Sequence, residues 1–175
     1  LALASELVER VRTLPSIVMK HMMGFVSKWP EADATSFVTA ALNSTSAPHR
    51  QAALEGLTES QAFRCAQLIR IRLHDPNPAI RAEALRWVFR LDDEGAVPEL
   101  AKELERPTVT PTERRQVYRT LAHLGVPAIP VLVRWLAKEQ DPSSLAELVN
   151  QLGRTREPNA LAALKKAADD PQTPK

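Results

Sequence analysis

The chain has 175 residues, of which 44% are hydrophobic and 25% are charged. That balance is typical of a folded soluble domain and excludes a chain that is disordered through most of its length. The 23 basic and 21 acidic residues leave a net charge of +2, which argues against wholesale nucleic-acid binding.

The residue content predicts helices from end to end. Only 5 glycines occur, and the dominant residues are alanine, leucine, arginine and glutamate, all strong helix formers. The prolines stand between apolar-periodic segments or in their first turns, where a helix tolerates them. Apolar residues spaced three or four apart then mark about 11 helices. In chain order they cover 2–11, 15–29, 34–42, 48–57, 60–73, 78–91, 94–104, 112–124, 127–138, 143–152 and 158–168.

The predicted helices form a repeat. The stretch AVPELAKEL at 96–104 returns as AIPVLVRWL at 128–136. A period in the thirties with two helices per unit is typical of an α-solenoid, because stacked helix pairs bury faces that one pair cannot. Short connections make neighbouring helices antiparallel. Four leucines mark the period of 32 residues, namely Leu68, Leu100, Leu132 and Leu164.

The segment Asp75–Leu85 carries a family resemblance. Its Asp75-Pro76, its aliphatic–arginine pair Ile80-Arg81, and the alanine and leucine that follow resemble a HEAT repeat, in the short form of the phycobilisome-lyase type. The resemblance implies an all-α fold, a right-handed α-solenoid or superhelix, with the second, arginine-bearing helix of each pair on the concave side. We predict an N-terminal helical cap over 1–30, a HEAT-like repeat array over 31–170 and a disordered tail over 171–175.

No residue pattern indicates catalysis. The chain has four histidines, and none has the spacing of metal ligands. A glycine-rich phosphate loop and a nucleophile elbow are both missing from the sequence. The acidic run 92–94 directly precedes a predicted helix, where carboxylates cap free N–H groups. We therefore predict a protein that is not an enzyme, with no metal site and no cofactor.

Basic residues are the candidates for a binding site. They recur at matching positions of the predicted helices 78–91 and 112–124. On the inferred concave side they would form two basic rows, a groove for an acidic peptide, phosphate or nucleic acid. The other interpretation is local salt bridging, which fits Arg81 and Arg114 best because they stand at the family's structural arginine position. The predicted binding residues are Arg86, Arg90, Arg115, Arg119 and His123.

The resemblance and the missing catalytic pattern favour a protein-protein interaction scaffold or adaptor with a protein partner, and an acidic one suits the basic rows. The alternative is a nucleic-acid-binding protein related to the HEAT-like alkylpurine DNA glycosylases, although their Trp-Trp-Asp signature is missing. A third reading, a tetrapyrrole chaperone or lyase, would need an open cysteine or histidine.

Three further features complete the sequence-based expectations. The one cysteine, Cys65, cannot form an internal disulfide, which suits a cytoplasmic location. No apolar run approaches the ~20 residues of a membrane span, so we expect no membrane insertion. The apolar cluster Met19, Met22, Met23 and Phe25 belongs to the predicted cap or, equally, to a contact surface.

Overall fold

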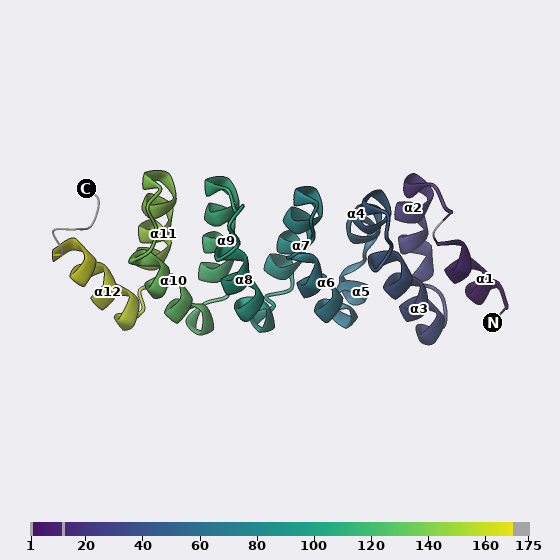
Figure 1. The fold of residues 1–175 in the computed structure, drawn as a ribbon. Coiled ribbons are helices and arrows are strands. Elements are labelled where there is room, and N and C mark those ends of the chain that lie inside the picture. Colours follow the sequence, from purple (N-terminus) through teal and green to yellow (C-terminus); the bar gives the residue numbers. More distant parts are fainter. Residues whose placement is uncertain (1, 12, 170–175) are drawn as a thin grey trace. The chain divides into compact units, whose positions relative to one another are not determined.

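A computed structural model describes residues 2–11 and 13–169, with side chains from Glu6 onward (Figure 1). Within those residues every regular element is a helix, which confirms the all-α prediction. The chain divides into two compact units, residues 1–91 and 92–175. The predicted tail over 171–175 lies outside the described residues.

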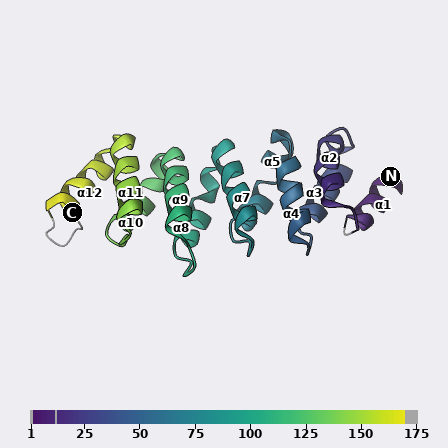
Figure 2. The same ribbon diagram turned by 90° about the horizontal axis from the view of Figure 1, so that it is seen from above.

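Unit 1 places its helices in two rows. One row holds α1 (Ala2–Arg10), α3 (Glu31–Leu42) and the pair α5 (Glu59–Arg64) and α6 (Ala66–Arg72). The other row holds α2 (Ser16–Val26), α4 (Ala47–Gly56) and α7 (Pro78–Arg90) (Figures 1 and 2). Along the rows, α1 packs on α3, α2 packs on α4, and α4 packs on α7. Along its own row, α4 therefore contacts an equivalent helix on each side.

Unit 2 repeats the arrangement. Its first helices are α8 (Val97–Leu104), α10 (Ile129–Leu136) and α12 (Pro158–Asp169), and its second helices are α9 (Pro111–His123) and α11 (Pro142–Thr155). Short 3-10 turns, Glu94–Ala96 and Val126–Ala128, lead into α8 and α10. The α9–α11 and α10–α12 contacts run along the two rows. Stacked helix pairs of this kind are an α-solenoid, as the sequence period predicted.

Polar caps and prolines define where the second helices begin. The cap residues are Ser46, Asn77, Thr110 and Asp141, and each helix has a proline in its first two positions. Thr110 makes a full capping box with Glu113, and Asn77 and Asp141 each accept one backbone N–H of the first turn. The caps Ser46, Asn77 and Thr110 each stand four residues before an arginine, whereas Asp141 stands four residues before Leu145.

The repeating leucines lie on α6, α8, α10 and α12, the first helices of their pairs. Leu100 and Leu132 are completely buried. Leu68 and Leu164 are half-buried, and in α6 the neighbouring Ile69 takes the buried position. The single helix predicted over 60–73 is wrong in one respect, because Cys65, with φ −101° and ψ 16°, separates α5 from α6.

Candidate interaction surface

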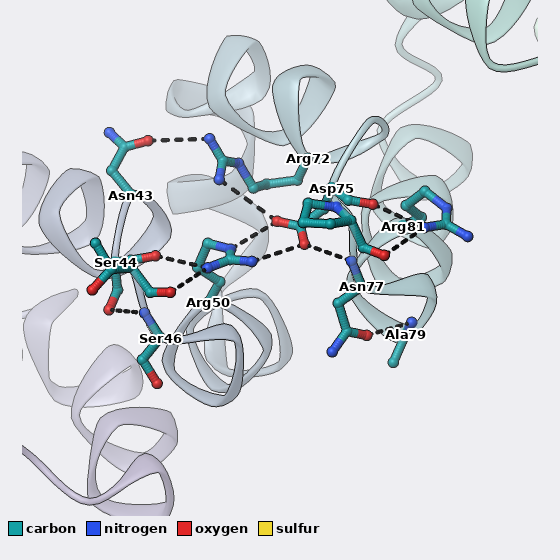
Figure 3. Close-up of polar contacts among 11 residues, drawn as sticks. Asn43, Ser44, Ser46, Arg50, Arg72, Asp75, Asn77, Ala79 and Arg81 are labelled. Atoms are coloured by element: carbon teal, nitrogen blue, oxygen red, sulfur yellow. Dashed lines mark hydrogen bonds and ion pairs between the residues drawn. The ribbon is translucent and has the colours of Figure 1, made fainter. Parts of the chain in front are cut away.

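Arg50, four residues after the cap Ser46, belongs to the interior of unit 1. Arg50 donates two hydrogen bonds to the Asp75 carboxylate, from Nε to Oδ2 at 2.7 Å and from Nη2 to Oδ1 at 2.9 Å (Figure 3). Its Nη1 donates to the carbonyl oxygens of Ser44 and Thr45 at 2.9 and 3.1 Å. Side-chain exposure is 9% for the arginine and 1% for the aspartate. A buried pair satisfied in this way joins α4 to the loop before α7.

Asp75 is the hub of this polar cluster. Its Oδ1 also accepts the backbone N–H of the cap residue Asn77 at 3.0 Å, and Arg72 Nη1 lies 3.7 Å from Oδ2. Burial alone would raise the pKa of Asp75, but the hydrogen bonds from Arg50 and Asn77 outweigh it and lower that pKa. The carboxylate therefore stays charged and serves the fold rather than a ligand.

Arg81 is the structural arginine of α7. Its Nη1 donates to the carbonyl oxygens of Asp75 and Pro76 at 2.9 and 3.1 Å (Figure 3). These bonds tie α7 to the turn that precedes it. The structural role predicted for this arginine is confirmed.

Unit 2 builds a corresponding cluster around Glu139. Arg114 Nε lies 3.1 Å from Glu139 Oε2, and the Tyr118 hydroxyl donates to the same oxygen at 2.7 Å. Glu139 Oε1 accepts the backbone N–H groups of Gln140 and Asp141. Burial, together with the bond to the glutamate, raises the pKa of Tyr118. Arg114, like Arg81, has a structural role.

Two of the predicted binding residues lie on α7 of unit 1. Arg86 is 69% exposed and forms an ion pair with Glu83 one helical turn earlier. The Arg90 guanidinium lies 4.3 Å from the ring centroid of Trp87. The Trp87 indole is buried and donates to the Leu54 carbonyl at 2.8 Å, so it packs between α4 and α7. Arg90 therefore rests on a fixed aromatic platform.

The other three lie on α9 of unit 2. Arg119 makes two bonds to Glu147 on α11, at 2.8 and 2.7 Å, and its side chain is 56% exposed. The bond to Arg119, against the cost of desolvation, lowers the pKa of Glu147 to about 2. Arg115 Nη2 donates to the Thr112 hydroxyl at 3.2 Å, and His123 Nε2 lies 2.6 Å from Asp92 Oδ1.

The structure therefore groups Arg86 with Arg90 and Arg115 with Arg119 and His123, each set on one helix at four-residue spacing. The sequence interpretation missed the fixed carboxylates beside them. Glu83 was visible as an oppositely charged residue three positions before Arg86. Glu147 was not, because no sequence signal places a residue of α11 beside one of α9.

The part of the chain that the structure describes has neither a candidate metal site nor a reactive cysteine. No group of histidine, cysteine, aspartate and glutamate residues there could hold a metal ion. Cys65 is buried, and burial raises the pKa of its thiol, so it is a packed residue rather than a reactive one. None of the described helices has the length and apolar content needed to cross a membrane.

Comparison with protein families gives a match over part of the chain. Residues 108–175 match the family model of HEAT repeats, a stretch that includes α9 to α12. A search of curated proteins finds no match to the chain.

Proposed function

We propose, because this chain is a HEAT-like repeat protein, that it is a non-catalytic scaffold or adaptor for an acidic protein partner. HEAT repeats commonly mediate protein interactions. The partner would contact the exposed faces of the second helices, which the family resemblance assigns to the concave side. The binding residues we propose are Arg86, Arg90, Arg115, Arg119 and His123.

The supporting observation is the matched position of two oriented guanidinium groups. Arg86 and Arg119 each follow their helix cap by nine residues, and each is more than half exposed. Each is held by a carboxylate, Glu83 or Glu147. A guanidinium has five N–H donors, and Arg119 uses its Nε and Nη2 edge for Glu147. Donors at Nη1 remain for a carboxylate of the partner.

Orientation of these side chains favours binding. A free arginine carries about 2 kcal/mol of rotamer entropy, part of which is lost when it binds. Arg119, fixed by two bonds, and Arg90, resting on Trp87, have lost part of that freedom before a partner arrives. Charged groups of this kind chiefly speed association and select the partner by charge.

The test is capture of partners from the source organism by the intact protein and by charge-reversed variants. Exchanging all four arginines, Arg86, Arg90, Arg115 and Arg119, for glutamate should abolish capture of a specific partner. The control exchanges Arg64 and Arg134, two exposed arginines of first helices that form looser pairs at 3.5 and 3.7 Å. It is matched in charge to the variants that exchange only Arg86 with Arg90 or only Arg115 with Arg119. The control should retain the partner, and circular dichroism should show both variants folded.

Two results would count against the proposal. Retention of every partner by the four-arginine variant would leave those side chains as solvated surface. Equal loss in the control would show that net charge, rather than the second-helix face, decides binding. Variants that change only α7 or only α9 then show which unit carries the contact.

A further inference from the structure

Three second helices carry a basic residue at the same place, thirteen residues after the cap. These residues are Arg90 in α7, His123 in α9 and Arg154 in α11. The caps of the three helices are 33 and 31 residues apart, so a constant period does not align Arg154 with the other two. On the basis of the scaffold function proposed above, we propose that Arg154 and Arg119 of unit 2 bind one extended acidic segment of the protein partner.

The pattern of burial shows that these two arginines point outward. The residues seven and eleven positions after the cap are buried in both second helices of unit 2, namely Val117, Leu121, Leu148 and Leu152. At 3.6 residues per turn, positions nine and thirteen lie on the opposite side of the helix. Arg119, at position nine of α9, and Arg154, at position thirteen of α11, are accordingly exposed. Because α9 packs against α11, the two arginines belong to neighbouring helices (Figures 1 and 2).

The repeat does not require a basic residue on this outward side. In α4 of unit 1, Glu55 stands nine residues after the cap, at the position that Arg119 occupies in α9. In α11 the same position is the neutral Asn150. The positive charge on the outward side is therefore a property of particular helices and not a condition for stacking them.

Arg154 and Arg119 differ in how much of their charge is already used. Within the residues that the structure describes, no carboxylate pairs with Arg154. Arg119 is bound through Nε and Nη2 to Glu147, which also accepts Gln151 Nε2 at 2.7 Å. Arg154 thus offers its whole guanidinium and Arg119 offers Nη1. Two such groups on neighbouring helices complement a partner segment that carries two carboxylates.

The distance between packed helices favours an extended protein segment as the occupant. The axes of packed helices lie about 8–10 Å apart. An extended chain advances about 3.3 Å per residue, so carboxylates about three residues apart reach both helices. A nucleic-acid strand carries a charge on every nucleotide, which two arginines, one of them already held by Glu147, match poorly.

Binding of a labelled peptide of about eight glutamates to the full chain, followed by fluorescence anisotropy, tests the proposal. The variant Arg154→Glu should raise the dissociation constant about tenfold, and Arg154→Gln should raise it less. The control Arg134→Glu makes the same change of charge at an arginine of the first helix α10 that is 49% exposed. It should change the constant less than about twofold. A peptide of glutamines of the same length should not bind.

Circular dichroism must show each variant folded, because a cation in the last turn of a helix also stabilises the helix dipole. If Arg154→Glu does not fold, Arg154→Gln, which adds no negative charge, carries the test. Three results would overturn the proposal: no binding of the glutamate peptide by the original chain, equal binding by folded Arg154 variants, or tighter binding of a single-stranded DNA oligonucleotide.

The scaffold function is judged separately, by capture of the partner from the source organism. If the four-arginine variant loses the partner and folded Arg154→Glu captures it normally, the scaffold function stands and the role of Arg154 is refuted. If the four-arginine variant keeps every partner, the scaffold function fails on its own test, whatever the glutamate peptide shows.

Discussion

Within unit 1 and within unit 2, an arginine–carboxylate pair at matching positions connects neighbouring helices, but the two pairs use different residues. In unit 1 the pair is Arg50 and Asp75, and in unit 2 it is Arg114 and Glu139, and both pairs span 25 residues. Each carboxylate stands two residues before the next helix cap and accepts that cap residue's N–H. The arginine and the carboxylate therefore occupy the same positions in both repeats, but the carboxylate belongs to an aspartate in unit 1 and to the longer glutamate in unit 2.

The difference lies in the other groups that share the carboxylate. The short Asp75 side chain binds Arg50 through both oxygens and has Arg72 nearby. The longer Glu139 receives one arginine nitrogen and the hydroxyl of Tyr118. The side chains around the carboxylate in unit 1 are two positively charged arginines. In unit 2 they are one arginine and one neutral hydroxyl. The comparison predicts that the two clusters respond differently to mutation and to pH.

The largest effect is expected from Asp75→Ala. Removing one partner of a buried pair leaves the other charge uncompensated, so the free energy of unfolding should fall by about 3–5 kcal/mol. Glu139→Ala should cost less, because the Arg114 side chain is 22% exposed and can reach water. Urea denaturation followed by circular dichroism measures both losses.

The double variant Asp75→Ala with Arg50→Met is the control for this prediction. It removes the stranded charge, so it should be more stable than Asp75→Ala alone. A double variant that loses the sum of the two single effects would show that the pair is not coupled. A larger loss for Glu139→Ala than for Asp75→Ala would contradict the difference drawn between the units.

The next effect is expected from Tyr118→Phe in unit 2. The change removes one hydrogen bond to a charged acceptor, which corresponds to about 1.5–3 kcal/mol. The same change in a Glu139→Gln background should cost less, because the acceptor there is neutral. A double-mutant cycle from thermal or urea unfolding gives the coupling. A coupling of zero would mean that the hydroxyl contributes nothing to holding Glu139.

The repeat made the fold predictable, and it predicted one class of arginine well. Proline positions and the leucine period gave the helix pairs, because they depend on residues close in sequence. The structural role of Arg81 and Arg114 was implied by the resemblance to HEAT repeats, in which they stand at the structural arginine position. The partners did not follow, because the sequence does not show that the Asp75 carboxylate binds Arg50, 25 residues away, while Arg81 donates to the Asp75 carbonyl.

The exposed arginines show the same limit. Glu83 beside Arg86 is an intrahelical pair, which spacing alone can indicate. The pairing of Arg119 with Glu147 depends on how α9 and α11 are aligned against each other. Apolar periodicity defines which face of a helix is buried, but not its axial alignment with the neighbouring helix. The break at Cys65 between α5 and α6 likewise has no proline or glycine to mark it.

A smaller, graded effect is expected at alkaline pH. The chain has one tyrosine, so absorbance of phenolate reports Tyr118 alone. The pKa of Tyr118 is raised in the folded chain, whereas in the unfolded chain it is about 10. Ionisation of the tyrosine therefore favours unfolding. The Tyr118 contribution is therefore complete below pH about 10 and is lost as pH rises above it. Phenolate should appear only together with loss of helix, and early phenolate in a folded chain would contradict the buried bond to Glu139.

The smallest effect is expected at the exposed pair of unit 2, with Arg119→Ala. Surface pairs contribute about 0–1 kcal/mol, so stability should change little at neutral pH. The lowered pKa of Glu147, about 2, should return toward its ordinary value of about 4.3, which carboxyl NMR titration measures.

The pH dependence at this pair has the opposite sign to that of Tyr118. Because Glu147 has a depressed pKa, its contribution is present above pH about 4.3 and is lost as pH falls toward about 2. Added salt should shrink the difference between Arg119→Ala and the original chain, as it does for exposed charges. A loss of several kcal/mol would make Arg119 a structural residue like Arg50. A small loss would show that Arg119→Ala stays folded. Loss of a partner by that variant could then be attributed to the missing side chain and not to unfolding.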